Sequence, residues 1–178
     1  MTPQANTSLS QPQLLNSAGL LFITQGILIL QPTHTASQKT TGAYIHSVLN
    51  LLGVLSLLSG LAVIVYNKAA HNGAHFTSVH GRLGLSVYIL FTLQALIGAV
   101  AFYTPGLLGG VQRAKATYKY HRISGYAVVV LSFAAVATAT QTPFNINVLH
   151  IRLWAVIVCA VILLMGVLPR IKKQKLGL

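Results

Sequence analysis

Five long apolar runs alternate with short polar segments along the chain of 178 residues. A helix needs about 20 residues to cross a hydrocarbon core of about 30 Å, since it rises 1.5 Å per residue. The runs are of about this length and cover residues 12–30, 44–66, 80–103, 121–140 and 148–168. A backbone in lipid must satisfy its own hydrogen bonds, and barrel strands give weaker, alternating runs. We therefore expect five transmembrane helices.

Short polar connections join antiparallel neighbours, so the expected fold is all-α, an integral membrane up-and-down helical bundle. Residues 1–10 are expected to form a polar outer tail, residues 11–169 the transmembrane domain, and residues 170–178 a basic tail. The start of the chain carries no basic residue. A secretory signal begins with positive charge, so the first run is expected to be a true span.

The basic residues predict the orientation of the bundle, because cytoplasmic loops are enriched in Lys and Arg. One side of the predicted bundle holds three of them: Lys68, Arg82 and Arg152. The other side holds nine: Lys39, Arg113, Lys115, Lys119, Arg122, Arg170, Lys172, Lys173 and Lys175. We expect the second side and the C-terminus to be cytoplasmic and the N-terminus to face outward.

The amino-acid composition excludes several classes of catalytic and metal site. The chain has 12 Lys and Arg, no Asp or Glu, one Cys, 54% hydrophobic and 7% charged residues, against about 25% charged in soluble domains. Paired-carboxylate catalysis, carboxylate metal sites and a cysteine zinc site are therefore excluded. Because the basic residues flank apolar runs, the bilayer is the expected partner rather than nucleic acid.

Three of the seven histidines open predicted helices: His46, His80 and His121. Ionisable side chains in a membrane bundle are costly and are functional candidates by default. Span order alone puts His46 and His121 at one depth and His80 at the opposite face. Two imidazoles at equal depth on non-adjacent helices suit the axial positions of a haem, whereas a zinc site needs three or four ligands together.

Small residues follow each of these histidines at helical spacing, and they indicate either room for a flat cofactor or close approach of helices. They are Asn50, Gly53 and Gly60 after His46, Gly84 and Gly98 after His80, and Gly125 and Ser132 after His121.

The segments YIHSVLN (44–50), HFTSVHGRLG (75–84) and YKYHRISG (118–125) resemble the cytochrome b-561 family, especially its short single-domain members. The resemblance runs from about residue 11 to 168. It implies a four-helix core with two b-type haems, one near each membrane face. It further implies electron transfer between ascorbate and monodehydroascorbate or ferric iron.

Carried over by position, His46 and His121 would ligate the iron of the cytoplasmic haem. His80 would ligate the outer haem together with a histidine in a His-Pro pair, where this chain has Gln11 and Pro12. Three explanations stay open: the outer haem is absent or held by His80 alone, His150 substitutes, or Gln11 stands where the natural sequence has histidine.

The resemblance also implies substrate sites. His75 occupies the place of a histidine that helps bind reductant at the outer face. Basic residues near the cytoplasmic haem bind ascorbate in the family, and the candidates here are Lys39, Arg113, Lys115 and Lys119. The enediolate anion of ascorbate would be bound favourably by such cations. The same basic residues also determine the orientation of the helices in the membrane.

The sequence thus predicts a transmembrane haem oxidoreductase with no catalytic side chain of its own. Its expected small-molecule partners are ascorbate or a similar reductant, with ferric iron or monodehydroascorbate as acceptor. The resemblance also allows a homodimer or a larger membrane complex. The alternative is a non-enzymatic scaffold subunit that has lost one or both haems. A solute transporter is less supported, since only Gln25, Gln94 and Ser56 place polar groups in mid-span.

Overall fold

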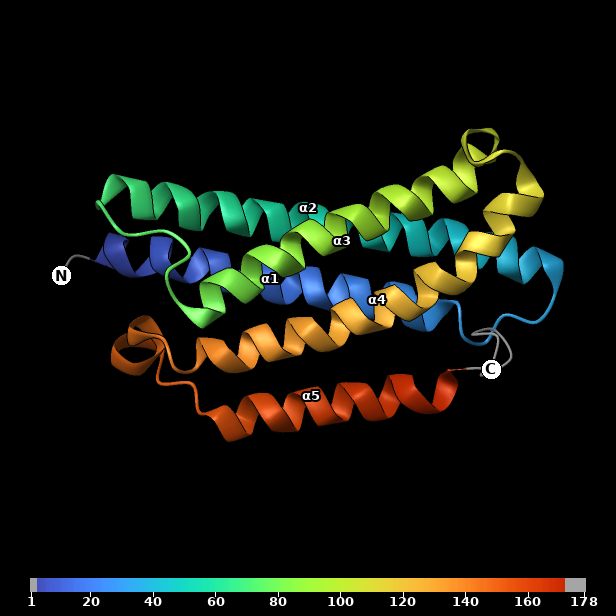
Figure 1. Cartoon of the computed structure of the whole chain (residues 1–178). Helices are drawn as coiled ribbons and strands as arrows, with labels where there is room; N and C mark the ends of the chain where they lie inside the picture. The colour runs from blue at the N-terminus through green and yellow to red at the C-terminus, as the bar shows by residue number, and fades with distance from the viewer. Residues whose placement is uncertain (1–2, 172–178) are drawn as a thin grey trace. The chain divides into compact units, whose positions relative to one another are not determined.

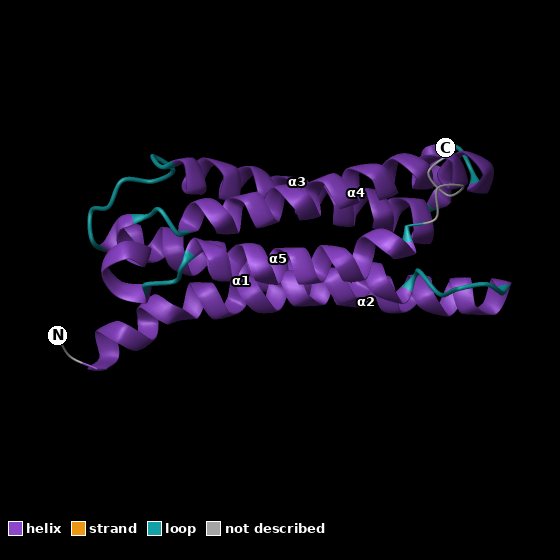
Figure 2. Ribbon diagram, turned by 90° about the horizontal axis from the view of Figure 1, so that it is seen from below, coloured by secondary structure: helices purple, strands orange, loops and turns teal. Residues whose placement is uncertain are grey.

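The computed structural model describes residues 3–171, with side chains for residues 11–169 and 171, and within these residues it contains helices and no strand (Figure 2). The long helices are α1 (Pro3–Ile29), α2 (Ala36–Ala70), α3 (Val79–Tyr103) and α4 (Val111–Ala139), followed by the shorter α5 (Leu153–Val167). Short helical turns lie between or after them: η1 (Pro105–Leu108), the π-helical η2 (Asn145–Leu149) and η3 (Leu168–Arg170). Figure 1 labels the five α-helices.

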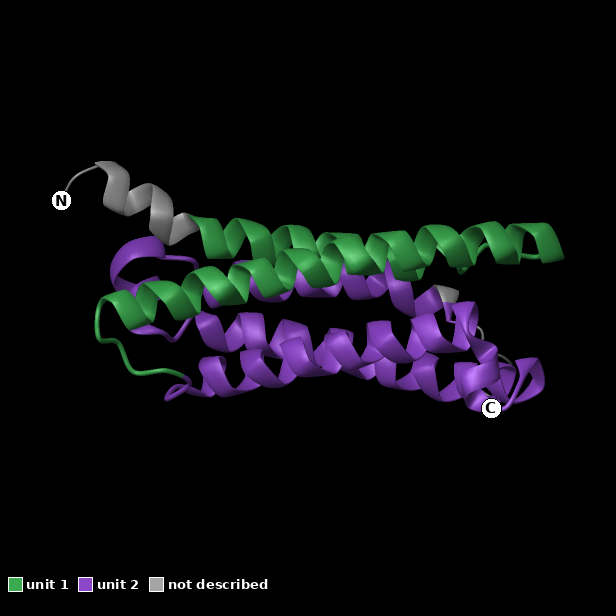
Figure 3. Cartoon of the chain, turned by 90° about the horizontal axis from the view of Figure 1, so that it is seen from above, with its two compact units in different colours: residues 1–75 green, residues 76–178 purple. Residues whose placement is uncertain are grey.

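The chain divides into two compact units, Met1–His75 and Phe76–Leu178 (Figure 3). The first is a hairpin of α1 and α2, which lie side by side and run antiparallel. The second contains α3, α4 and α5, with α4 packed against both of the others. Each unit is described by itself below.

Glycines let α1 and α2 approach closely. Gly19 and Gly26 of α1 and Gly53 and Gly60 of α2 are all buried, and each pair is spaced by seven residues. A Cβ atom at Gly53 would lie 2.6 Å from Ile23 Cγ1 and 3.0 Å from the Gly19 carbonyl oxygen. Ile23, at 2% exposure, fills the gap that these glycines leave. Small residues at such spacing are typical of packed membrane helices.

Gly53→Ala is therefore expected to destabilise the α1–α2 hairpin by about 1–3 kcal/mol, the usual cost of overpacking. The added methyl group meets a backbone oxygen and a β-branched side chain, neither of which can rotate away easily. The measurement is unfolding of the purified protein by SDS in mixed micelles. Gly166→Ala is the matched control, because no atom of another described segment lies within 4 Å of a Cβ at that position. Equal midpoints for both variants would contradict the packing argument.

Side-chain hydrogen bonds cross from α3 to α4 near both ends of the pair. The Tyr118 hydroxyl donates to the Ala101 carbonyl oxygen at 3.3 Å, and His80 Nδ1 donates to the Ala135 carbonyl oxygen at 2.8 Å. Between them, Gln94 Nε2 donates to Ser124 Oγ. These bonds hold α3 and α4 in one register.

Helices α2 and α4 each begin about ten residues before the predicted boundary. Residues 36–43 and 111–120, expected to be connections, are helical. The capping box of Thr35 and Gln38 starts α2. In it, the backbone N–H of Gln38 donates to Thr35 Oγ1 at 3.2 Å. Hydropathy predicts only the apolar part of a helix, so it missed these polar first turns. His46 and His121 consequently lie inside helices rather than at their starts, whereas His80 lies in the first turn of α3.

The helix predicted from residue 12 begins earlier, at Pro3, so Pro12 lies inside α1 rather than in its first turn. Within the part of the chain that the structure describes, four helical segments are long and apolar enough to cross a membrane: Gln11–Ile29, Ala36–Ala70, Val79–Tyr103 and Val111–Ala139. The chain is thus an integral membrane protein with an all-helical fold.

The fifth predicted span is only partly present as helix. α5 has 15 residues, about 22 Å at 1.5 Å per residue, which is shorter than a hydrocarbon core of about 30 Å. The buried Asn145 explains its late start. Asn145 Nδ2 donates to the Ile151 carbonyl oxygen at 2.9 Å, and Ile151 N donates to Asn145 Oδ1 at 3.1 Å. These bonds hold residue 151 outside a helix. Lys172, Lys173 and Lys175 of the predicted basic tail lie outside the described residues.

Candidate functional site

His46 is half-buried on α2 and faces α1. Its Nδ1 lies 2.7 Å from the carbonyl oxygen of Gly26. A carbonyl oxygen only accepts, so Nδ1 carries the proton and the lone pair of the neutral ring is on Nε2. Asn50, one turn along α2, donates its amide hydrogen to the His46 carbonyl oxygen at 2.7 Å. A metal-ligating histidine is ordinarily oriented in this way, by donating its other ring N–H to a carbonyl group.

His80 is held in the same way in the second unit. Ser78 caps α3 by accepting from Gly81 N at 3.0 Å, which starts the helix just before His80. His80 Nδ1 then donates to the carbonyl oxygen of Ala135 on α4 at 2.8 Å. Again Nε2 carries the lone pair, so His46 and His80 share a tautomer suited to binding iron.

His121 lies about 15 Å along α4 from its first residue, at 1.5 Å per residue, and its ring rests against α3. A Cβ atom at Gly98 would lie 3.0 Å from His121 Cε1 and 3.4 Å from Nε2. Gly98 therefore makes room for the His121 ring, not for a cofactor beside His80 as its position after His80 suggested.

The glycines predicted to clear cofactor space divide into two groups. Gly53 and Gly60 are filled by α1 side chains, with Ile23 against the first and Asn16 against the second. For these two the helix-approach interpretation is the correct one. Among the described residues, no atom of a neighbouring segment lies within 4 Å of a Cβ position at Gly84, and at Gly125 only Gln94 Oε1 does, at 3.9 Å. Each of these two lies one turn after a candidate ligand, His80 and His121 respectively.

The two weaker ligand candidates have different surroundings. Gln11 is exposed near the start of the first apolar span. His150 was expected to open the fifth helix, but it lies between η2 and α5 with φ of 55°, because Asn145 closes this turn by accepting from His150 N at 2.7 Å. Its side chain is exposed.

The candidate substrate cations lie on the polar first turns of α2 and α4. Lys39 is exposed on α2, and Arg113, Lys115 and Lys119 are exposed on α4 before His121. Lys119 Nζ lies 5.9 Å from the centroid of the Tyr120 ring. Within residues 3–171 no carboxylate side chain competes for these cations, since the chain has none. His75 is exposed in the connection between α2 and α3.

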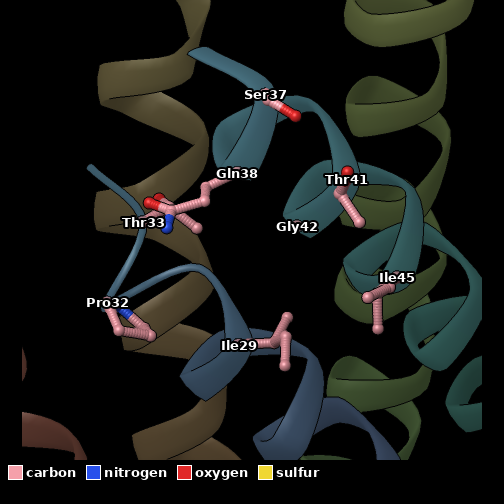
Figure 4. A pocket seen from close by; sticks show the side chains of 8 residues that line it. All are labelled: Ile29, Pro32, Thr33, Ser37, Gln38, Thr41, Gly42 and Ile45. Atoms are coloured by element: carbon pink, nitrogen blue, oxygen red, sulfur yellow. The ribbon is translucent and has the colours of Figure 1, made fainter. Parts of the chain in front are cut away.

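A pocket of about 390 Å³ opens beside the polar start of α2. Side chains from the end of α1, the connection and the first turns of α2 surround it (Figure 4). Its polar lining comes from Thr33, Ser37, Gln38 and Thr41, and its apolar lining ends at Ile45, the residue before His46. The sequence analysis missed this pocket, because its hydroxyl groups lie in a segment predicted to be a connection.

Comparison with known proteins gives consistent matches. A sequence model of eukaryotic cytochrome b561 matches residues 12–145, from α1 through α4, and ends before α5. Human transmembrane reductase CYB561D2 is 32% identical over 128 residues, which are 70% of this chain and 56% of that protein. Bovine transmembrane ascorbate-dependent reductase CYB561 is 26% identical over 117 residues, 65% of this chain and 45% of that protein. The chain thus spans about half the length of the curated relatives it matches.

Proposed function

The chain belongs to the cytochrome b561 family, and on that premise we propose that it carries electrons across a membrane from ascorbate to monodehydroascorbate or ferric iron. Relatives in this family are named transmembrane reductases, one group of them ascorbate-dependent. The single observation that carries the proposal is the contact of 2.7 Å between His46 Nδ1 and the Gly26 carbonyl oxygen. Because a carbonyl oxygen only accepts, this contact assigns the proton to Nδ1 and the lone pair to Nε2.

The family implies haem b, and the donor chemistry of this chain fits it. A bound haem b would supply one-electron redox chemistry. We propose that His46 and His121, which lie on different helices, would hold the iron of one such haem through their ring nitrogens. Two imidazole ligands leave no open position on the iron, which suits electron transfer rather than oxygen binding. The open positions at Gly84 and Gly125 support room for a flat group next to the ligand-bearing helices.

A second haem is proposed at His80. Its ring is oriented by the Ala135 carbonyl oxygen as His46 is by Gly26. The candidates for the second ligand of this haem are Gln11 and His150. The exposed side chain of His150 lies outside any helix, so Gln11 is the candidate that keeps the family position.

We propose that α1 to α4 form the haem-binding core and that α5 lies outside it, since the family match ends before α5. The N-terminus is proposed to be non-cytoplasmic, because nine basic residues are assigned to the side where α2 and α4 begin and three to the other side. Both helices then begin on the cytoplasmic side, which gives Lys39, Arg113, Lys115 and Lys119 access to a cytoplasmic reductant.

Ascorbate is proposed to bind at the cytoplasmic side, at these cations and in the pocket at the start of α2. A pocket of about 390 Å³ lies in the size range of small-molecule sites. Its hydroxyl groups match a polyhydroxylated anion, and Lys39 directly follows Gln38, which lines the pocket. His75 is proposed to assist at the opposite face.

Thr41→Val is expected to raise KM for ascorbate about 3- to 10-fold, the loss of roughly one hydrogen bond, with little change in kcat. The variant keeps the size of the side chain but removes a hydroxyl group that lines the pocket. Thr40→Val is the matched control, because Thr40 points its hydroxyl to the Ala36 carbonyl oxygen at 3.1 Å and does not line the pocket. Equal KM values for the two variants would place the reductant elsewhere.

The proposed function is tested with purified protein in liposomes loaded with ascorbate. An impermeant ferric chelate added outside should be reduced at a rate that depends on the protein and on internal ascorbate. If the protein contains haem but no ferric chelate or monodehydroascorbate is reduced, the transmembrane relay is wrong. The scaffold alternative, motivated by Gln11, predicts protein without haem.

A further inference from the structure

The Gln94–Ser124 pair is a polar contact between α3 and α4, formed by a half-buried Gln94 and an exposed Ser124. Gln94 Nε2 donates to Ser124 Oγ, and Ser124 Oγ in turn donates to the Tyr120 carbonyl oxygen at 2.7 Å. Gln94 was visible in the sequence only as a polar residue in mid-span. The structure gives it a partner on the helix that carries His121.

The helical spacing places this pair one turn from the His121 ring. Gln94 and Gly98 are four residues apart on α3, and His121 and Gly125 are four apart on α4, so each couple shares a helix face. Gly98 contacts the ring of His121, and Gln94 faces Gly125. The register fixed by the Gln94–Ser124 hydrogen bond is therefore the register that seats Gly98 on the imidazole.

The side-chain amide oxygen of Gln94, Oε1, provides a second, independent observation. Gln94 Oε1 is buried and accepts no hydrogen bond from the described residues. Most buried polar atoms have a partner. Among the described residues of neighbouring segments, this oxygen is also the only atom within 4 Å of a Cβ position at Gly125. It thus borders the open space that follows His121 on α4.

We infer that Gln94 is a positioning residue for His121. Its hydrogen bond to Ser124 sets the orientation of the His121 imidazole, and its side-chain oxygen places a partial negative charge beside the space over Gly125. This inference rests on the proposed function, because its readout is the haem that His121 would ligate. A negative charge beside the iron stabilises the ferric state, so the amide oxygen should lower the midpoint potential of that haem.

The test uses purified, haem-loaded protein and three variants. Gln94→Leu keeps the side-chain bulk and removes both the hydrogen bond and the oxygen. This variant should retain haem. His121→Ala identifies which step of the redox titration belongs to the haem at His121, and in Gln94→Leu the midpoint potential of that step should be higher. The low-spin ferric signal in electron paramagnetic resonance should also shift. Ser124→Ala, a milder change, should shift the resonance signal in the same direction. The double variant should shift it no further than the larger single change.

Gln25→Leu is the matched control, since Gln25 is an exposed mid-span glutamine of α1. It should change neither readout. Haem-loaded Gln94→Leu and Ser124→Ala with the potential and resonance signal of the unmodified protein would overturn the inference while leaving the proposed function intact. If Gln94→Leu fails to accumulate, Ser124→Ala decides by its resonance signal. Protein without any haem would overturn the proposed function and this inference together.

Discussion

His46→Ala and His121→Ala are each expected to remove the same b-type haem from the purified protein. Both rings are proposed to ligate one iron, so losing either leaves a single axial bond and most of that haem should dissociate. The double variant should then lose no more haem than either single variant, because the two residues act as a unit. The measurement is haem content by pyridine haemochrome assay, together with the reduced-minus-oxidised spectrum.

His34→Ala serves as the control, because His34 is exposed in the connection between α1 and α2. Its haem content should equal that of the unmodified protein. Losses that add up in the double variant would mean that His46 and His121 ligate different haems. Full haem content in either single variant would remove that residue from the ligand set.

The second large effect is expected at the opposite face. His80→Ala should stop electron flow across the membrane while ascorbate still reduces the remaining haem, because one haem near one face leaves roughly half of a core of about 30 Å to be bridged. Gln11→His should act in the other direction and raise the occupancy of the second haem, since imidazole is a far better axial ligand than an amide. Flux in liposomes and haem content measure the two effects.

Gln25→His is the control for the gain of haem, because it adds an imidazole to the same helix away from the start of the span. It should leave haem content unchanged. Undiminished flux through His80→Ala protein would contradict the two-haem relay. Equal haem content in Gln11→His and unmodified protein would exclude Gln11 as the position of the second ligand.

The membrane-spanning helices and the family could be predicted because both depend on local sequence. Apolar runs mark the part of a helix that meets lipid, and the segments around His46, His80 and His121 carry the resemblance. The full helices could not be predicted in the same way. The first ten residues of α2 contain Ser37, Gln38 and Lys39, which are polar yet helical, so hydropathy assigned them to a connection.

The role of each glycine could not be predicted, because it depends on what the neighbouring helix presents. Gly53 and Gly84 look alike in sequence, one or two turns after a histidine. Ile23 of α1 fills the first position, whereas no atom approaches the second. Only the register between helices separates close packing from open space.

At the start of α5 a side-chain hydrogen bond to nearby backbone overrides the hydropathy pattern. The apolar run from residue 148 predicts a helix, but the side chain of Asn145 binds the backbone of Ile151 through both donor and acceptor. His150 is consequently held in a left-handed turn outside any helix. His46 and His80 are also oriented by backbone carbonyl oxygens, but these lie on another helix, and the sequence could not indicate which carbonyl oxygen each would meet.

The most direct test of haem ligation by these histidines is a redox-difference spectrum of the purified full chain with haem quantitation. We expect an ascorbate-reducible b-type absorbance and more than one haem per chain, with the second site incompletely filled because Gln11 is a weaker ligand than histidine. Helical protein that carries no haem after expression with adequate haem supply would contradict the account and leave only the membrane helices.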